Sequence, residues 1–402
     1  MRGQELRNPV VAALGRRLRL ALIGGGPGSF IGEIHRCAAR MDDRYEIVAA
    51  ALSSHPERSR SAGLMLGLQE GRAYTSAQAL FDGEAARSDG AEVVAIMTPN
   101  DSHHPYCLAA IERGMDIICD KPMTVDLGQA LDLVARVRRS GLVFCLTHNY
   151  SGYPMVRQAR AMVAAGLLGE VRLVQVEYVQ GGDAEAAPAS DKPVHWRQIR
   201  ERSGASLVLG DIGTHAHHLA AFVTGQHLAE VAADVGSIVP QRSTHDFAGM
   251  LLRYANGARG VMWVTQAAAG IENCIRIRVS GSLGSVEWWQ ENPNLLSVAP
   301  LHGAAQILTR NGPGSLPAAQ RACRIVKGHP EGFPEAFANL YSDAAEAIAA
   351  RRAGSSADPL ALDFPSVEDG ARGLAFIQAA VDSSAANGAW TDCRLPLPER
   401  AL

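Results

Sequence analysis

Short apolar runs alternate with amphipathic segments through the first 150 residues of the chain. Turn-forming residues bound five of these runs, which is typical of buried parallel strands: 18–23, 46–52, 93–97, 117–119 and 142–146. The segments between them have an apolar face at helical spacing and predict helices: the segment after Gly32 with Ile34, Cys37, Ala38 and Met41, then 56–70 and 76–88, then the segment with Cys107, Leu108 and Ile111 that stops at Gly114, and 126–139. This alternation predicts an α/β domain with a parallel sheet covered on both faces.

A different pattern begins after residue 150, where a helix is predicted over 154–169. Runs rich in Val, Ile, Tyr and Trp then predict further strands: 171–180, 231–239, 247–255, 259–266, 274–280 and 285–289. Asn256-Gly257 lies between two of them and is a hairpin signal. We expect an open sheet whose wide face is buried against another subunit, in a homodimer or homotetramer.

The remaining segments are less regular. Residues 181–193 are expected to form a loop over a crevice, and residues 291–330, rich in Pro and Gly, a long irregular excursion. Helices near 333–351 and 366–386 close the chain. A length of 402 residues favours two domains, and we divide the chain into an N-terminal extension and two domains: 1–17, 18–148 and 149–402.

Composition narrows the class of protein. Apolar residues make up 47% and charged residues 20% of the chain, and the net charge of −3 gives no reason to expect a nucleic acid or a membrane surface as partner. No apolar run approaches the ~20 residues that a membrane span needs. The seven cysteines show no metal-binding spacing, and several, such as Cys37 and Cys145, lie in apolar runs. They predict reduced, buried thiols in a cytoplasmic protein.

A glycine-rich loop follows the first predicted strand. Gly24, Gly26 and Gly28 precede a predicted helix, which is the arrangement that holds a dinucleotide pyrophosphate at a helix N-terminus. Gly32 fits the third glycine of the usual G-x-G-x-x-G pattern only if the loop has three extra residues.

The second predicted strand ends in Ser53-Ser54, where this motif usually has an acidic residue for the ribose 2′-hydroxyl. Arg58 follows closely, so a hydroxyl and a guanidinium could bind a 2′-phosphate, which favours NADP. Arg58 as a solvated helix residue stays an open alternative.

The stretch 92–122 is the centre of the predicted chemistry. Two of its strands deliver the loops 98–103 and 120–122, and ligands bind outside the carboxyl ends of parallel strands. Both loops should therefore open on one crevice. Lys121, placed there by a strand and followed by a proline, is a better candidate for chemistry than for an ordinary surface lysine.

A second constellation lies in 206–222, where Gly210 and Gly213 break the pattern before a helix begins. Asp211 and His215 are four residues apart, which puts them on one side of a helix start and suits general acid–base work. A metal site at His215, His217 and His218 is a weaker hypothesis, because adjacent helical side chains diverge and no fourth ligand is evident. His217 fits a buried core histidine.

These motifs resemble those of a known family. G-E-I-H at 32–35, T-P-N-x-x-H at 98–103 and D-K-P at 120–122 are similar to motifs of the Gfo/Idh/MocA oxidoreductases, which include glucose–fructose oxidoreductase and inositol dehydrogenase. The resemblance runs from about Leu18 to about Glu287. The family usually has Glu where this chain has Asp120. It implies a Rossmann domain followed by an α+β domain with an open, mostly antiparallel sheet.

The resemblance also implies a reaction, in which a hydride passes between nicotinamide and a secondary alcohol carbon of a sugar, glycoside or cyclitol. The family's D-x-x-x-H motif matches Asp211 and His215, which with Lys121 would form the catalytic group. His215 would take or give the hydroxyl proton, Lys121 would bind the same oxygen, and Asp211 would orient His215 or bind a neighbouring hydroxyl. Lys121 as the proton acceptor is the alternative.

Site residues follow from the motifs and the resemblance together. The predicted cofactor contacts, for NAD(P), are Gly24, Gly26, Gly28, Phe30, Ile31, Gly32, Ser53, Ser54, Arg58, Thr98, Pro99, Asn100, His103, Asp120, Lys121, Asn149, Trp196 and Arg197. The predicted substrate contacts are Lys121, Tyr150, Tyr153, Tyr178, Asp211 and His215. Tyr178 fits a core position equally well.

Two other functions are compatible with the same fold. Some relatives cleave glycosides through transient oxidation at C3 of the sugar, with the cofactor recycled. A non-catalytic sensor that binds dinucleotide and a partner protein is less favoured, because the lysine and histidine of the catalytic group are both present.

Overall fold

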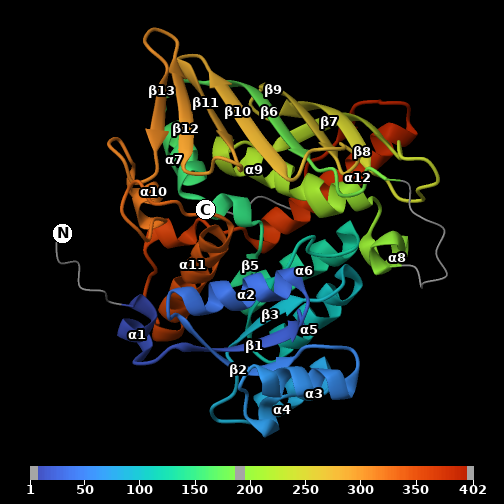
Figure 1. The fold of residues 1–402 in the computed structure, drawn as a ribbon, viewed down its shortest axis with the longest axis vertical. Coiled ribbons are helices and arrows are strands. Elements are labelled where there is room, and N and C mark those ends of the chain that lie inside the picture. The colour runs from blue at the N-terminus through green and yellow to red at the C-terminus, as the bar shows by residue number, and fades with distance from the viewer. Residues whose placement is uncertain (1–7, 186–194, 396–402) are drawn as a thin grey trace. The chain divides into compact units, whose positions relative to one another are not determined.

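The computed structural model describes residues 8–185 and 195–395 (Figure 1). The chain forms two compact units, each made of discontinuous segments. The first unit contains 1–123, 129–152 and 333–367, and the second contains 124–128, 153–332 and 368–402. The predicted loop at 181–193 falls largely outside the described residues, as does the start of the N-terminal extension.

The first unit is built on a parallel five-stranded sheet with the order β2-β1-β3-β4-β5. Its strands are β1 (Leu18–Gly24), β2 (Tyr45–Ala51), β3 (Val93–Met97), β4 (Asp116–Cys119) and β5 (Phe144–Leu146). β3 is buried at every position, as its unbroken apolar run predicted. The strand order reverses at β1, which lies between β2 and β3, and such a reversal is where ligands bind in open α/β sheets. The predicted doubly wound α/β domain is confirmed.

Helices connect these strands, and one arrives from far along the chain. They are α1 (Pro9–Leu14), α2 (Phe30–Met41), α3 (Pro56–Met65), α4 (Ala77–Ala85), α5 (His103–Glu112), α6 (Leu127–Ser140) and α11 (Phe333–Ala353). α11 packs against α2 in the first unit (Figure 1). Tyr45, Phe337 and Tyr341 are buried in the core there. The edge of the Tyr341 ring meets the Tyr45 ring at 5.5 Å between centroids.

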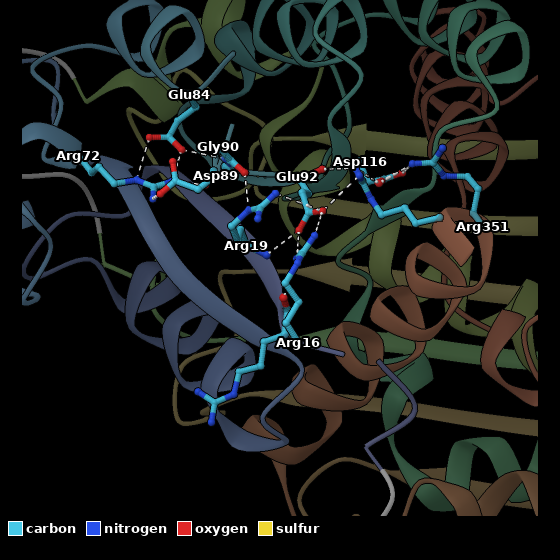
Figure 2. Close-up of polar contacts among 12 residues, drawn as sticks. Arg16, Arg19, Arg72, Glu84, Asp89, Gly90, Glu92, Asp116 and Arg351 are labelled. Atoms are coloured by element: carbon cyan, nitrogen blue, oxygen red, sulfur yellow. Dashed lines mark hydrogen bonds and ion pairs between the residues drawn. The ribbon is translucent and has the colours of Figure 1, made fainter. Parts of the chain in front are cut away.

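Ion pairs gather where the strands of the first sheet begin (Figure 2). Glu92, next to β3, accepts hydrogen bonds from Arg16 at 2.6 and 2.7 Å. Asp116, the first residue of β4, is fully buried and accepts from Arg351 at 2.8 Å and from Arg352 at 3.1 Å. Arg351 and Arg352 lie in the last turn of α11. The network therefore holds that helix at the end of the sheet where the strands begin, opposite the predicted crevice.

The second unit holds a nine-stranded sheet with the order β13-β12-β11-β10-β6-β9-β8-β7-β14. Its strands are β6 (Val171–Val179), β7 (Leu228–Gly236), β8 (Phe247–Tyr254), β9 (Arg259–Thr265), β10 (Cys274–Gly281), β11 (Gly284–Trp289), β12 (Leu295–Pro300), β13 (Gln306–Thr309) and β14 (Thr391–Asp392). β6 and β9 are parallel and the other neighbours antiparallel, which confirms the predicted open sheet. The β8–β9 hairpin turns at Asn256-Gly257 as predicted, with Gly257 at φ +90°.

Helices of the second unit are α7 (Pro154–Ala164), α8 (Arg200–Ser203), α9 (Thr214–Thr224), α10 (Pro317–Arg321) and α12 (Val367–Ala385). The prediction that 291–330 is irregular is wrong, because β12, β13 and α10 lie within it. Buried Arg310 organises the rest of this excursion by donating to Asn294 at 2.8 Å and to Glu331 at 2.7 Å. These hydrogen bonds join residues that are far apart in the sequence, so a local pattern of apolar and polar residues does not reveal them.

The cysteine prediction needs one correction. All seven cysteines lie in the described residues and are free, but Cys274 and Cys323 are only partly buried and Cys37 is exposed. It lies on the outer face of α2, which an apolar neighbourhood in sequence does not reveal. In the described part of the chain no helix is long and apolar enough to cross a membrane.

Candidate active site

The glycine loop of the first unit has a conformation that only glycine supports at its ends. Gly25 has φ +64°, and a Cβ on Gly32 would lie 2.1 Å from the carbonyl oxygen of Gly25. The two backbones therefore touch, and the loop closes directly onto the N-terminus of α2. Ser29 caps that helix by accepting from the Gly32 amide at 3.2 Å. An exposed loop of this shape at a helix N-terminus fits a pyrophosphate.

A groove of about 600 Å³ runs beside this loop. Four of the predicted cofactor contacts line it, namely Gly26, Gly28, Ser53 and Arg58, whereas Ser54 does not. Sequence reasoning missed Glu57, whose carboxylate shares the groove with Arg58. Its position in the first turn of a helix gave no signal, because acidic residues are common there for reasons of the helix dipole. Phe30, at the start of α2, is 68% exposed beside the loop.

The loops after β3 and β4 meet, as predicted. His103 is 1% exposed, and its Nδ1 lies 3.0 Å from the Pro122 carbonyl oxygen while its Nε2 lies 2.9 Å from that of Thr98. The imidazole thus lies between 98–103 and 120–122, and in either neutral tautomer it donates to one of the two carbonyls. A Cβ on Gly24 would lie 2.7 Å from the Thr98 side chain, so the glycine loop joins the same group of loops.

Lys121 stands in this group on a braced backbone. Asp120 accepts from the Lys121 amide at 2.9 Å and from the Thr147 hydroxyl, which follows β5, at 2.9 Å. The side chain of Asp120 is thereby used inside the protein, and Lys121 is half-buried. Three neighbouring strand ends therefore fix the position of Lys121. Pro99 and Asn100 lead into α5 through a short 3₁₀ turn.

The other predicted catalytic residues lie in the second unit. The helix predicted after Gly210 and Gly213 is α9, which begins at Thr214. The glycines themselves lie in a π-helical turn at Leu209–Gly213 that continues into α9, which the sequence did not reveal. Such turns are frequent at functional sites because they re-aim side chains. Asp211 lies in that turn and accepts from the Gln266 Nε2 at 2.9 Å. His215 is 7% exposed, and its ring centroid lies 6.1 Å from that of Tyr178.

The neighbouring histidines are core residues. The ring of His217 stacks on Phe376 at 4.7 Å, and burial lowers its pKa to about 3. His218 stacks on Phe222, and burial lowers its pKa to about 4. Both are therefore neutral near pH 7. The described residues contain no group of three or more His, Cys, Asp or Glu arranged to hold a metal ion.

The remaining predicted contacts are mostly buried. Tyr150 is 2% exposed and packs on Phe333 in the first unit, and Tyr153 is 1% exposed and packs on Trp288 in the second. Asn149, after β5, is buried, and its Nδ2 has no hydrogen-bond partner among the described residues.

The predicted pair Trp196-Arg197 forms a 3₁₀ turn, with the guanidinium of Arg197 4.7 Å from the Trp196 ring. Ile31 follows Phe30 in the first turn of α2.

Comparisons with known proteins agree with this arrangement. Residues 18–148 match an oxidoreductase family with an NAD-binding Rossmann fold, and residues 156–287 match the GFO/IDH/MocA C-terminal domain. The uncharacterized oxidoreductase YfiI of Bacillus subtilis is 33% identical over 386 residues, which cover 94% of this chain and 98% of the relative.

Two solved structures share the whole fold. An oxidoreductase from Sinorhizobium meliloti is 44% identical, with a TM-score of 0.84 over 93% of this chain and 99% of that chain. An inositol dehydrogenase homolog from Azotobacter vinelandii, solved with NADH and myo-inositol, is 35% identical, with a TM-score of 0.87 over 94% of this chain and 98% of that chain.

Proposed function

The chain belongs to the GFO/IDH/MocA family of NAD-binding oxidoreductases, as its motifs indicated, and we propose that it is a dehydrogenase acting on a sugar, glycoside or cyclitol. The observation that carries the proposal is the pair of catalytic elements. One is Lys121, on a braced loop beside the glycine cradle, and the other is Asp211 with His215 at a π-helical turn.

The chain's own residues divide the work of oxidation between them. His215 takes the hydroxyl proton of the substrate, and Asp211 orients His215 or binds a neighbouring hydroxyl. Lys121 donates a hydrogen bond to the same substrate oxygen and stabilises the charge that develops on it. A nicotinamide dinucleotide, when bound, supplies the hydride acceptor. Gly24, Gly26 and Gly28 would hold its pyrophosphate, because this loop leaves the backbone bare at a helix N-terminus.

The choice between NAD and NADP rests on the groove at Ser53. Arg58 lines it and can pair with a 2′-phosphate, which supports NADP. Glu57 lines the same groove and opposes a phosphate by charge repulsion, so the preference depends on which side chain lies nearer the ribose. We retain NADP as the proposal.

The exposed face of the second sheet supports a homo-oligomer. Leu173, Leu251, Val261 and Trp263 are 41–58% exposed on adjacent strands β6, β8 and β9. A groove of about 470 Å³ lies on this face, with Trp390 at its border. An apolar patch on a wide, uncovered sheet suits the self-complementary contact of a two-fold dimer.

The activity test begins with the absorbance of the purified protein, to detect bound dinucleotide. Sugars, cyclitols and glycosides are then screened with NAD⁺ and NADP⁺ at 340 nm. Release of an aglycone without net absorbance change would replace the dehydrogenase by a glycoside-cleaving enzyme with recycled cofactor. Binding of dinucleotide without turnover of any substrate would point to a sensor.

Variants test the catalytic assignment. Lys121→Ala and His215→Ala should each lower kcat by about 10²–10⁴-fold, because each removes a group that acts on the reacting oxygen. Dinucleotide affinity should stay within about threefold of wild type. The exposed residues Lys327 and His302 supply matched controls as alanine variants. Near-normal turnover in either catalytic variant would remove that residue from the mechanism.

A further inference from the structure

Four carboxamide side chains lie side by side at one end of the strands in the second sheet. The strands β11, β10, β6 and β9 are consecutive neighbours in the sheet. Each is flanked by an amide residue at the same end of the strands: Gln290, Asn273, Gln180 and Gln266. We call these four residues the carboxamide row. Because β10 runs antiparallel to β6 and β11, the row joins the ends of three strands and the start of one.

The row is a directed chain of hydrogen bonds. Asn273 donates through Nδ2 to Gln290 at 2.7 Å, and Gln180 donates through Nε2 to Asn273 at 2.5 Å. Gln266 donates through Nε2 to Gln180 at 3.4 Å and to the Asp211 carboxylate at 2.9 Å. Tyr178 adds a bond from its hydroxyl to Asn273 at 3.0 Å. The row therefore ends at the proposed catalytic carboxylate.

The last contact fixes which way the Gln266 amide points. An ionised carboxylate only accepts hydrogen bonds, so the atom of Gln266 that faces Asp211 must be its nitrogen. The nitrogen uses its two hydrogens on Asp211 and Gln180. The carbonyl oxygen Oε1 is then directed away from both of them.

That oxygen is a buried acceptor in need of a donor. Gln266 is 8% exposed, and its Oε1 has no hydrogen-bond partner in the described part of the chain. Buried acceptors are rarely left in this state, because each unmet hydrogen bond costs free energy. A bound molecule can supply that donor. Gln266 bonds Asp211, and Asp211 lies in the same turn-and-helix segment as His215.

We propose that Gln266 is a specificity-determining residue, whose Oε1 accepts a hydrogen bond from a substrate hydroxyl other than the one oxidised. A carboxylate and an amide oxygen on two hydrogen-bonded side chains match a ligand that offers more than one hydroxyl donor. The selected class is therefore a polyhydroxylated ring. This inference rests on the proposed function, since it assigns the ligand of the same site.

Discrimination between a polyol and its deoxy analogues tests the role of Oε1. Binding of myo-inositol, D-glucose and their monodeoxy analogues is measured by calorimetry on the protein loaded with NADPH and, separately, with NADH. Wild type should bind at least one parent compound about 10- to 100-fold more tightly than one of its deoxy analogues, because the analogue leaves Oε1 unpaired. Gln266→Met should lower that ratio to below threefold.

Two further variants separate this role from a structural one. Gln378→Met makes the same substitution at an exposed position of α12 and should keep the wild-type ratio. Gln266→Glu keeps an acceptor oxygen but loses the donors to Asp211 and Gln180, so it should keep most of the discrimination while kcat falls. A shift in the pH profile of kcat in Gln266→Glu alone would mark its effect on Asp211.

The outcomes also separate this inference from the proposed function. Discrimination that depends on Gln266 without any reduction of NAD⁺ or NADP⁺ would sustain the inference and overturn the dehydrogenase. A Gln266→Met variant that folds and still rejects every deoxy analogue as wild type does would overturn the inference. Failure of the wild-type protein to bind any of these polyols, or to distinguish them, would overturn it as well.

Discussion

Gly32→Ala is the sharpest test of the dinucleotide cradle. The added Cβ would lie 2.1 Å from the Gly25 carbonyl oxygen and 2.5 Å from the Gly25 Cα. Real Cβ atoms essentially never approach another atom closer than 3.0 Å, so the loop and α2 must separate by about 0.9 Å. Both partners are backbone, so no side-chain rotation can relieve the contact.

The displacement sets the expected loss of affinity. Hydrogen bonds from the loop amides to a pyrophosphate must stay near 2.9 Å, and a shift of this size breaks at least one of them. A charge-assisted hydrogen bond contributes about 1.5–3 kcal/mol, which corresponds to a loss of about 10- to 100-fold in Kd for the dinucleotide. The melting temperature should fall as well, because the loop is closed in the free protein too.

The assay is a fluorescence titration with NADH and NADPH, with calorimetry to record unfolding. Gly71→Ala is the matched control, since a Cβ there meets nothing within 4 Å, and it should leave Kd and Tm unchanged. A Gly32→Ala protein with Kd within threefold of wild type would refute the reasoning. The loop would then either bind no pyrophosphate or tolerate the shift.

Three further predictions concern specificity, stability and assembly. Arg58→Ala should weaken NADPH binding more than tenfold and NADH binding less than threefold; equal losses in titrations would refute an NADP preference. Burial alone raises the pKa of Glu92, but hydrogen bonds from Arg16 and Arg19 bring it below its ordinary value of 4.5. Its stabilisation is thus present above that pH and lost as pH falls through the folded pKa, so Glu92→Gln should narrow the stability gap between pH 7 and pH 3 in denaturant titrations. Val261→Glu should shift the oligomer to monomer in light scattering, while an unchanged mass would place the interface elsewhere.

The first sheet could be predicted because its strands are buried on both faces. A parallel strand such as β3 then reads as an unbroken apolar run, and the turn residues around it mark its ends. The return of α11 to the first unit could not be predicted in this way. Its apolar face shows that the helix is buried but not which unit it packs against, and that choice is made by contacts with residues some 300 positions earlier, such as Tyr45.

The candidate site shows the same division. Glycine, proline and lysine at strand ends carry a local signal, so the loops around Lys121 were found from the sequence. The π-helical turn at Asp211 was missed because glycine propensity argues for a break, and tertiary packing overrides propensity. The carboxamide row carries no local signal at all. Gln180, Gln266 and Asn273 cannot be told from other polar residues in the sequence. Only the strand order places them together at one end of neighbouring strands.

α11 links the two ends of the parallel strands in the first sheet, the end where they begin and the end that carries the glycine loop. Where the strands begin, Arg351 and Arg352 bond the fully buried Asp116 and so hold the last turn of α11 (Figure 2). Twenty-one residues of helix span about 31 Å, which carries the other end of α11 toward the glycine loop. There Phe333 lies 6.0 Å from Phe30, and Tyr341 bonds the buried His35 of α2 at 2.7 Å. A helix anchored by ion pairs where the strands begin therefore packs against α2, whose N-terminus follows the glycine loop. If that loop binds a pyrophosphate as proposed, loss of the ion pairs at Asp116 should weaken dinucleotide binding.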